Sequence, residues 1–140
     1  MNFTKREVTK AEHDKICDDF KQIDMEYNIP DANTERLNVT ADEDGEVVVF
    51  ASGLINHKWF YITDLWVTKK YRGQGFSAKA LAMLEADAKA RGIKHVYTRT
   101  SGYNSNEIFY QKQGYKICCV FEDYYEIKDG HHIFLRKELI

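Results

Sequence analysis

An apolar stripe predicts a helix near the N-terminus. Its members recur three or four residues apart, as one face of a helix requires: Ile16, Phe20, Ile23 and Tyr27. Thr9, with Glu12 three residues later, predicts a capped start, and Pro30 predicts the end. The residues before the cap, 3–8, are expected to form a first strand.

The pattern then changes to the period of strands. Residues 36–41 alternate between apolar and polar, and residues 47–55 are rich in β-branched side chains. Between them, Asp44-Gly45 is a hairpin turn signal. Residues 59–68 are apolar on both faces and predict a central strand that is covered on both sides.

The second half alternates helices with strands. Residues 76–91 carry apolar positions every four residues, and Gly92 stands where a helix C-terminal cap belongs. Further along, the pattern predicts a strand, a short helix and a hairpin at 95–100, 104–113 and 115–139. This order predicts an α/β fold with a mixed sheet covered by helices. Because the chain has one proline and no low-complexity linker, residues 1–140 are expected to form one domain.

Composition narrows the class of protein. The chain has 20 Lys and Arg against 22 Asp and Glu, a net charge of -2, so a nucleic-acid partner is not expected. No apolar run is long enough to span a membrane, and no secretion signal is seen, so a cytoplasmic location without a membrane partner is expected. Cys17, Cys118 and Cys119 have no metal-ligand spacing, and we interpret them as buried apolar residues in a reducing compartment, with no metal site.

The most informative segment joins a strand to a helix. It reads Arg72-Gly73-Gln74-Gly75-Phe76-Ser77. The first amides of a helix lack internal partners and carry the positive end of its dipole. Glycines let the backbone turn tightly and approach a ligand, while an arginine and a serine add donors. The segment therefore predicts a diphosphate cradle.

Other phosphate motifs fit less well. The spacing of a P-loop, G-x-x-x-x-G-K-[ST], is absent. A dinucleotide fingerprint, G-x-G-x-x-G, would place Ala78 at its third glycine, and the loop follows an antiparallel hairpin, which is the wrong context for that fold. A βα turn that needs glycine only for its geometry remains open.

Two motifs together resemble the GNAT N-acetyltransferase superfamily. Residues 72–77 resemble its motif [QR]-x-x-G-x-[GA], with Ser77 as the one departure, and the preceding Leu-Trp-Val strand end also matches. Downstream, residues 108–115, Ile-Phe-Tyr-Gln-Lys-Gln-Gly-Tyr, resemble the family's F-Y-x-K-x-G-[FY]. The resemblance implies a mostly antiparallel mixed sheet of six to seven strands with helices on both faces. It also implies transfer of an acetyl group from acetyl-CoA to an amine by direct attack, with coenzyme A as co-product.

The resemblance also implies site residues. The cofactor would be held by the backbone of Leu65, Trp66 and Val67, by the loop residues Arg72, Gly73, Gln74, Gly75, Phe76 and Ser77, and by Asn106. Tyr110 would be the general acid that protonates the coenzyme A thiolate, because a phenol with a pKa of about 10 is protonated at neutral pH.

Several alternatives stay open. Asp64, expected to be buried in the central strand, is a candidate general base or a structural carboxylate. Tyr110 could only pack its helix, and Asn104 or Asn106 could only cap it. A non-catalytic acyl-CoA-binding module on the same fold is the second functional hypothesis. The acceptor, a small-molecule or a protein amine, is not specified by the sequence, and the family resemblance allows a homodimer.

Overall fold

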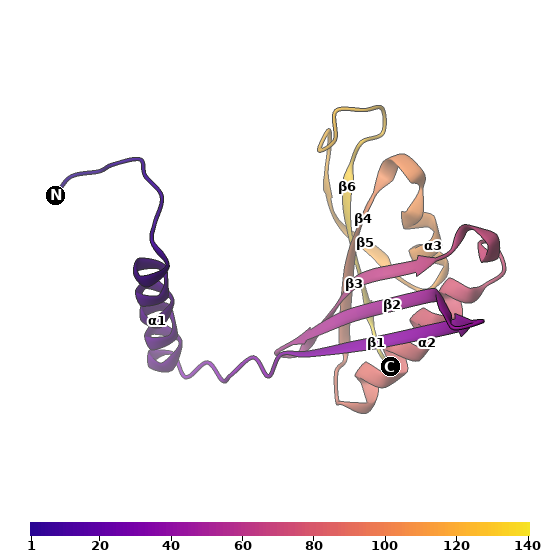
Figure 1. Ribbon diagram of the computed structural model, residues 1–140, viewed down its shortest axis with the longest axis horizontal. Helices are drawn as coiled ribbons and strands as arrows, with labels where there is room; N and C mark the ends of the chain where they lie inside the picture. Colours follow the sequence, from indigo (N-terminus) through magenta and orange to yellow (C-terminus); the bar gives the residue numbers. More distant parts are fainter. The chain divides into compact units, whose positions relative to one another are not determined.

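The computed structural model describes all residues from Met1 to Ile140 and divides them into two compact units, Met1–Ala32 and Asn33–Ile140 (Figure 1). The first unit holds one helix, α1 (Lys10–Glu26). Thr9 and Glu12 form the predicted capping box, in which each side chain accepts a hydrogen bond from the other residue's backbone N–H. The strand predicted at 3–8 is wrong: these residues have no regular structure, and their unit has no second strand to supply ladder hydrogen bonds.

The second unit is a six-stranded sheet with two α-helices. Its elements in chain order are β1 (Glu35–Glu43), β2 (Glu46–Asn56), β3 (Trp59–Val67), α2 (Phe76–Ala90), β4 (His95–Ser101), α3 (Asn106–Lys112), β5 (Lys116–Phe121) and β6 (His132–Glu138). The strand order is β1-β2-β3-β4-β6-β5, and only β3 and β4 run parallel. The predicted α/β fold with a mixed, mostly antiparallel sheet is confirmed.

The first hairpin follows from two residues. Asp44 and Gly45 have φ angles of +50° and +82°, and Glu43 pairs with Glu46 on either side of them. Two successive positive φ angles define the turn type that matches the twist of paired strands, and Asp-Gly adopts it easily. The sequence therefore determines this hairpin locally.

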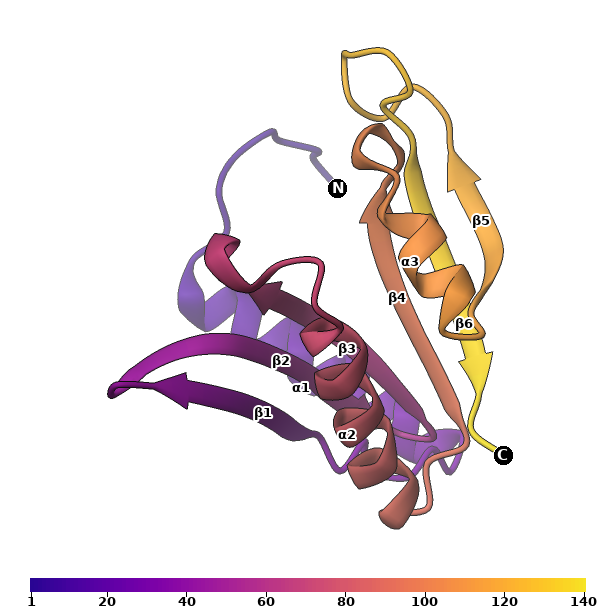
Figure 2. The same ribbon diagram turned by 90° about the vertical axis from the view of Figure 1, so that its right-hand side faces the viewer.

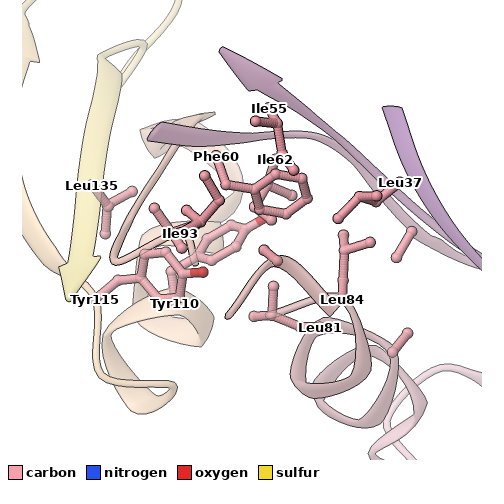
Figure 3. Close-up of a cluster of buried hydrophobic side chains, with 14 of the residues drawn as sticks. Leu37, Ile55, Phe60, Ile62, Leu81, Leu84, Ile93, Tyr110, Tyr115 and Leu135 are labelled. Atoms are coloured by element: carbon pink, nitrogen blue, oxygen red, sulfur yellow. The ribbon is translucent and has the colours of Figure 1, made fainter. Parts of the chain in front are cut away.

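The main core lies between one face of the sheet and the helices α2 and α3 (Figures 2 and 3). The predicted stripe of α2 is buried there at Ala80, Leu81, Leu84 and Ala88, whereas its first member, Phe76, is exposed. From the sheet, Phe60, Ile62 and Leu135 face these helices, and Tyr110 of α3 joins the same cluster. This packing fixes the N-terminus of α2 and the inner face of α3 relative to the strands.

Two burial predictions are wrong. Along β3 burial alternates, so Asp64 and Trp66 are exposed and the strand is not covered on both faces throughout. Cys118 and Cys119 are exposed as well, because they lie in β5, one of the two edge strands of the sheet, and all residues of β5 are exposed. None of the helices is long and apolar enough to cross a membrane.

Candidate active site

The strands β3 and β4 separate halfway along their length. Their parallel pairing runs from Trp59 with His95 to Ile62 with Thr98 and stops there, although β3 continues to Val67 and β4 to Ser101. At the same level β3 carries an extra residue, Thr63, because Gly53 pairs with Ile62 while the preceding Ser52 pairs with Asp64. Such a bulge bends a strand and ends its pairing. The result is a gap between two strands inside a continuous sheet.

The register shows which backbone groups of β3 face this gap. Thr68 N–H donates to Val48 C=O at 2.9 Å on the β2 side. Because hydrogen-bonded pairs recur at every second residue of an antiparallel ladder, Trp66 directs its N–H and C=O toward β2. Leu65 and Val67 therefore direct theirs toward β4, into the gap. In this gap, a ligand with an extended chain of amides can form hydrogen bonds with the β3 backbone, as a neighbouring strand would.

The glycine loop lies where β3 joins α2. Gly73 and Gly75 have φ angles of +76° and +84°, which favour glycine, and a Cβ at either position would meet no protein atom within 4 Å. Gly75 is the N-cap of α2, and the first helical bond runs from Lys79 N–H to Gly75 C=O. The amides of Phe76 and Ser77 are therefore without intrahelical partners. This open rim of donors has the form of an anion cradle.

Two side chains stabilise the loop. Arg72 Nε donates to the Val67 carbonyl at 3.0 Å and so ties the loop to the end of β3. The terminal amino groups of Arg72 remain for an anion. Gln74 makes a longer bond to the Lys70 carbonyl, at 3.4 Å. Arg72 thus has a structural role in addition to the charge that the sequence suggested.

Tyr110 lies at the closed end of the gap. It is 8% exposed, and its ring packs edge-on against Tyr115 at 5.4 Å between centroids. Burial raises the pKa of the Tyr110 hydroxyl, and a hydrogen bond with Thr98 offsets part of the rise. The raised pKa keeps the phenol protonated at neutral pH. Because Thr98 belongs to the last residue pair between β3 and β4, this phenol lies where the two strands separate.

Asp64 lies on the opposite face of the sheet from Tyr110. It pairs with Ser52, one position from the buried Ala51, so its side chain points away from the helix-covered face. The prediction that this carboxylate is buried is wrong, because the alternation of β3 exposes it. The Thr63 hydroxyl donates to Asp64 Oδ2 at 2.7 Å. Asp64 comes directly before Leu65 in β3, and the Leu65 N–H faces the gap.

A hydrogen-bonded network supports Thr63 from the neighbouring strands. Arg36 Nη1 donates to Thr63 Oγ1 at 2.9 Å and to Ser52 Oγ at 3.0 Å. The Ser52 hydroxyl in turn donates to Asn38 Oδ1 at 2.7 Å. These bonds cross three strands and hold the bulge in place.

The start of α3 borders the open end of the gap. Asn104 Oδ1 accepts a hydrogen bond from the Asn106 N–H at 3.4 Å, but the N-cap of α3 is Ser105 and no side chain caps the helix, so neither asparagine takes the capping role. Asn106 is exposed. Its contact with a cofactor stays a prediction.

Comparisons with known proteins agree with this geometry. Residues 5–115 match the acetyltransferase (GNAT) family. An acetyltransferase of Agrobacterium fabrum is 34% identical over 106 residues, which cover 71% of this chain and 74% of that protein.

The chain belongs to the GNAT acetyltransferase family.

Solved structures show the same fold. The crystal structure of an acetyltransferase from Bacillus cereus has a TM-score of 0.83 and 24% identity, and covers 98% of each chain. An aminoglycoside 6'-N-acetyltransferase complexed with coenzyme A has a TM-score of 0.64 and 20% identity, and covers 94% of this chain and 93% of that one. The chain therefore shares the overall fold of these acetyltransferases.

As a GNAT acetyltransferase, the chain uses acetyl-CoA as its donor, and the site fits that molecule. The loop of residues 72–77 offers free amides and open space to a diphosphate. The gap offers the backbone groups of Leu65 and Val67 to an amide chain. Family membership also makes the chain an acyltransferase with an amine acceptor.

Sequence reasoning missed two residues at this site. Thr98 joins the separating strands and contacts Tyr110, but in the sequence it is one threonine in a strand. Glu107 has a buried carboxylate oxygen, Oε2, without a hydrogen-bond partner. In the sequence Glu107 has the position of an ordinary acidic residue in the first turn of a helix, so no signal was available to find it.

Proposed function

We propose that this protein transfers the acetyl group of acetyl-CoA directly to a primary amine of a small molecule or a protein. The observation that carries the proposal is the gap between β3 and β4, with a phosphate cradle at its open end and a protonated phenol at its closed end. The coenzyme A complex of the similar aminoglycoside acetyltransferase supports the same use of this fold.

The cofactor would be held mainly by backbone groups, with added side-chain contacts. We assign the diphosphate to the amides of Gly73, Gln74, Gly75, Phe76 and Ser77 with the Arg72 guanidinium. Leu65 and Val67 would pair with the amide chain through their backbone. The Trp66 backbone, which the family resemblance also implied, faces β2 and not the gap, so only the Trp66 side chain, which is 43% exposed, remains in the proposal together with Asn106.

Bound acetyl-CoA supplies a thioester whose carbonyl carbon accepts the amine and whose sulfur leaves as coenzyme A. The Leu65 N–H would donate to the carbonyl oxygen as negative charge develops there. Tyr110 would give its hydroxyl proton to the departing sulfur, and its raised pKa keeps that proton available.

Asp64 would accept a proton from the incoming ammonium group. Its side chain and the Leu65 N–H are joined by one peptide unit, so a base and an oxyanion donor lie side by side on β3. Because Asp64 and Tyr110 belong to opposite faces of the sheet, the amine would approach from one face and the leaving group be protonated from the other.

Release of free thiol tests the proposal. The purified chain is incubated with acetyl-CoA and a panel of amines, and a thiol reagent reports coenzyme A. We expect amine-dependent release that is lowered by about 10² or more in Asp64→Asn, because a general base usually contributes at least that factor. Asp42→Asn, an exposed aspartate of β1, is the matched control and should be unchanged.

Two outcomes would count against it. Binding of coenzyme A without amine-dependent thiol release for any amine would favour the non-catalytic module. Full activity of Asp64→Asn would remove Asp64 as the base while leaving the transfer reaction in place.

Three further expectations belong to this proposal. The free cysteines suit a reducing compartment, and we propose a cytoplasmic location. We also propose that residues 1–140 act as one catalytic domain and can form a homodimer. Sedimentation analysis of the full chain checks the last point.

A further inference from the structure

An unpartnered oxygen is buried in the second unit, at the start of α3. Glu107 Oε2 is shielded from solvent and accepts no hydrogen bond from any protein group. A buried acceptor without a partner costs free energy, about 1–3 kcal/mol and more when it is charged. A native protein keeps such a group when a ligand supplies the missing donor, or when the strain serves another purpose.

The position of Glu107 indicates where that donor would lie. Glu107 and Tyr110 are three residues apart in α3, so they share one face of the helix. Tyr110 is on the buried face, beside Thr98, at the closed end of the gap. Glu107 therefore lies on the same side of α3 as Tyr110, about 4.5 Å from it along the helix axis.

The direction of α3 places Glu107 toward the open end. The chain leaves β4 at Ser101, turns through residues 102–104 and returns as α3 beside β4 (Figure 2). The first turn of α3 therefore lies near the end of β4, where β3 and β4 are farthest apart. A molecule that extends from the loop of residues 72–77 to Tyr110 would pass between Leu65 and Val67 on one side and Glu107 on the other.

We propose that Glu107 binds the pantetheine arm of acetyl-CoA by accepting a hydrogen bond from one of its amide N–H groups. The arm contains two secondary amides, each with one donor. The β3 backbone and the orphan carboxylate oxygen together supply acceptors to this arm from both walls of the gap. The inference rests on the proposed cofactor geometry and adds to it a side-chain contact opposite β3.

Binding of two ligands to three variants tests this inference. Coenzyme A contains the pantetheine arm, whereas adenosine 3′,5′-bisphosphate contains only its nucleotide end. Glu107→Ala should weaken coenzyme A by about tenfold or more, the usual effect of losing a hydrogen bond to a charged group, and should leave the bisphosphate unchanged. Glu107→Gln keeps an oxygen acceptor and should lie between wild type and Glu107→Ala. Gln111→Ala, at an exposed position of the same helix, is the control.

Thermal unfolding gives a second readout that a purely structural role would not reproduce. Without ligand, Glu107→Ala should be at least as stable as wild type, because it removes an unsatisfied buried acceptor. Coenzyme A should then raise the melting temperature less than it does for wild type.

Different results would contradict the role of Glu107 and the proposed cofactor geometry. Equal coenzyme A dissociation constants for wild type and Glu107→Ala would overturn the role of Glu107 alone. Equal weakening of both ligands, or a lower melting temperature without ligand, would assign Glu107 to the structure of the cradle and also overturn the inference. A wild-type chain that binds neither ligand would contradict the cofactor geometry itself.

Discussion

Thr98 donates its hydroxyl hydrogen to the Ile62 carbonyl at 3.2 Å, at the last residue pair that joins β3 to β4. Thr98 is 1% exposed and also contacts Tyr110. One buried side chain thus closes the gap at its vertex and touches the proposed acid. The Thr98 side chain therefore links the point where β3 and β4 separate to the position of the Tyr110 hydroxyl.

Thr98→Val should reduce both stability and turnover. Valine keeps the shape of threonine but leaves the Ile62 carbonyl without this donor, so we expect a loss of about 1 kcal/mol in the free energy of unfolding. Urea denaturation measures this loss. Thr100→Val, two residues along β4 and beyond the residues that pair with β3, should leave stability nearly unchanged. Equal losses in the two variants would show that the Thr98 hydroxyl has no special structural role.

Tyr110→Phe should lower turnover while coenzyme A binding is kept. The phenylalanine ring fills the same buried space, and only the proton donor is lost. General acids contribute about 10²–10⁴ in rate, so we expect a fall of at least about 10² in kcat with the dissociation constant of coenzyme A unchanged. Thiol release and calorimetric titration measure the two quantities.

Tyr124→Phe is the matched control for Tyr110→Phe, because Tyr124 is 57% exposed and lies outside the gap in the β5–β6 loop. Its turnover should equal that of wild type. If Tyr110→Phe also keeps full turnover, Tyr110 only packs its helix and another group protonates the sulfur.

Gly75→Ala should weaken coenzyme A more than it destabilises the fold. Gly45 offers a matched comparison: both glycines have φ near +83°, at +84° and +82°, and neither has a protein atom within 4 Å of an added Cβ. Each alanine should cost about 1 kcal/mol of stability through the unfavourable backbone conformation. Only at Gly75 would the methyl group enter the proposed diphosphate site, so only Gly75→Ala should raise the dissociation constant. Equal binding by both variants would contradict the cradle.

The protein should lose stability above pH 10. Burial raises the pKa of Tyr110, and burial together with the Glu85 charge raises that of Tyr115. Below an unfolded pKa of about 10 both states hold these protons, so the stabilising contribution is fully present. Above it the unfolded state releases them while the folded state keeps them, and stability falls by up to about 1.4 kcal/mol per pH unit for each tyrosine.

Urea unfolding between pH 9 and 11 measures this slope. Tyr115→Phe removes one of the two titrating phenols and should give a shallower decline than wild type, although it also loses the bond from the Tyr115 hydroxyl to Glu85 Oε1 and starts from a lower stability. The same slope in both proteins would mean that Tyr115 ionises alike in the folded and unfolded states.

The sequence by itself determined the elements whose causes are local. The capping box of α1, the Asp44-Gly45 turn and the stripe of α2 each depend on residues a few positions apart, and each is confirmed. The glycine loop was predicted for the same reason, since the free amides of a helix start and the positive φ of glycine are properties of a short segment.

Only the tertiary structure decided the rest. The strand expected at 3–8 has no partner, the exposure of Cys118 and Cys119 follows from their place on the edge strand, and the exposure of Asp64 follows from the register of β3. The meeting of Thr98 with Ile62 joins two strands that are separated by all of α2. The unpartnered oxygen of Glu107 is likewise a property of its surroundings, because burial and missing donors depend on residues brought together by folding.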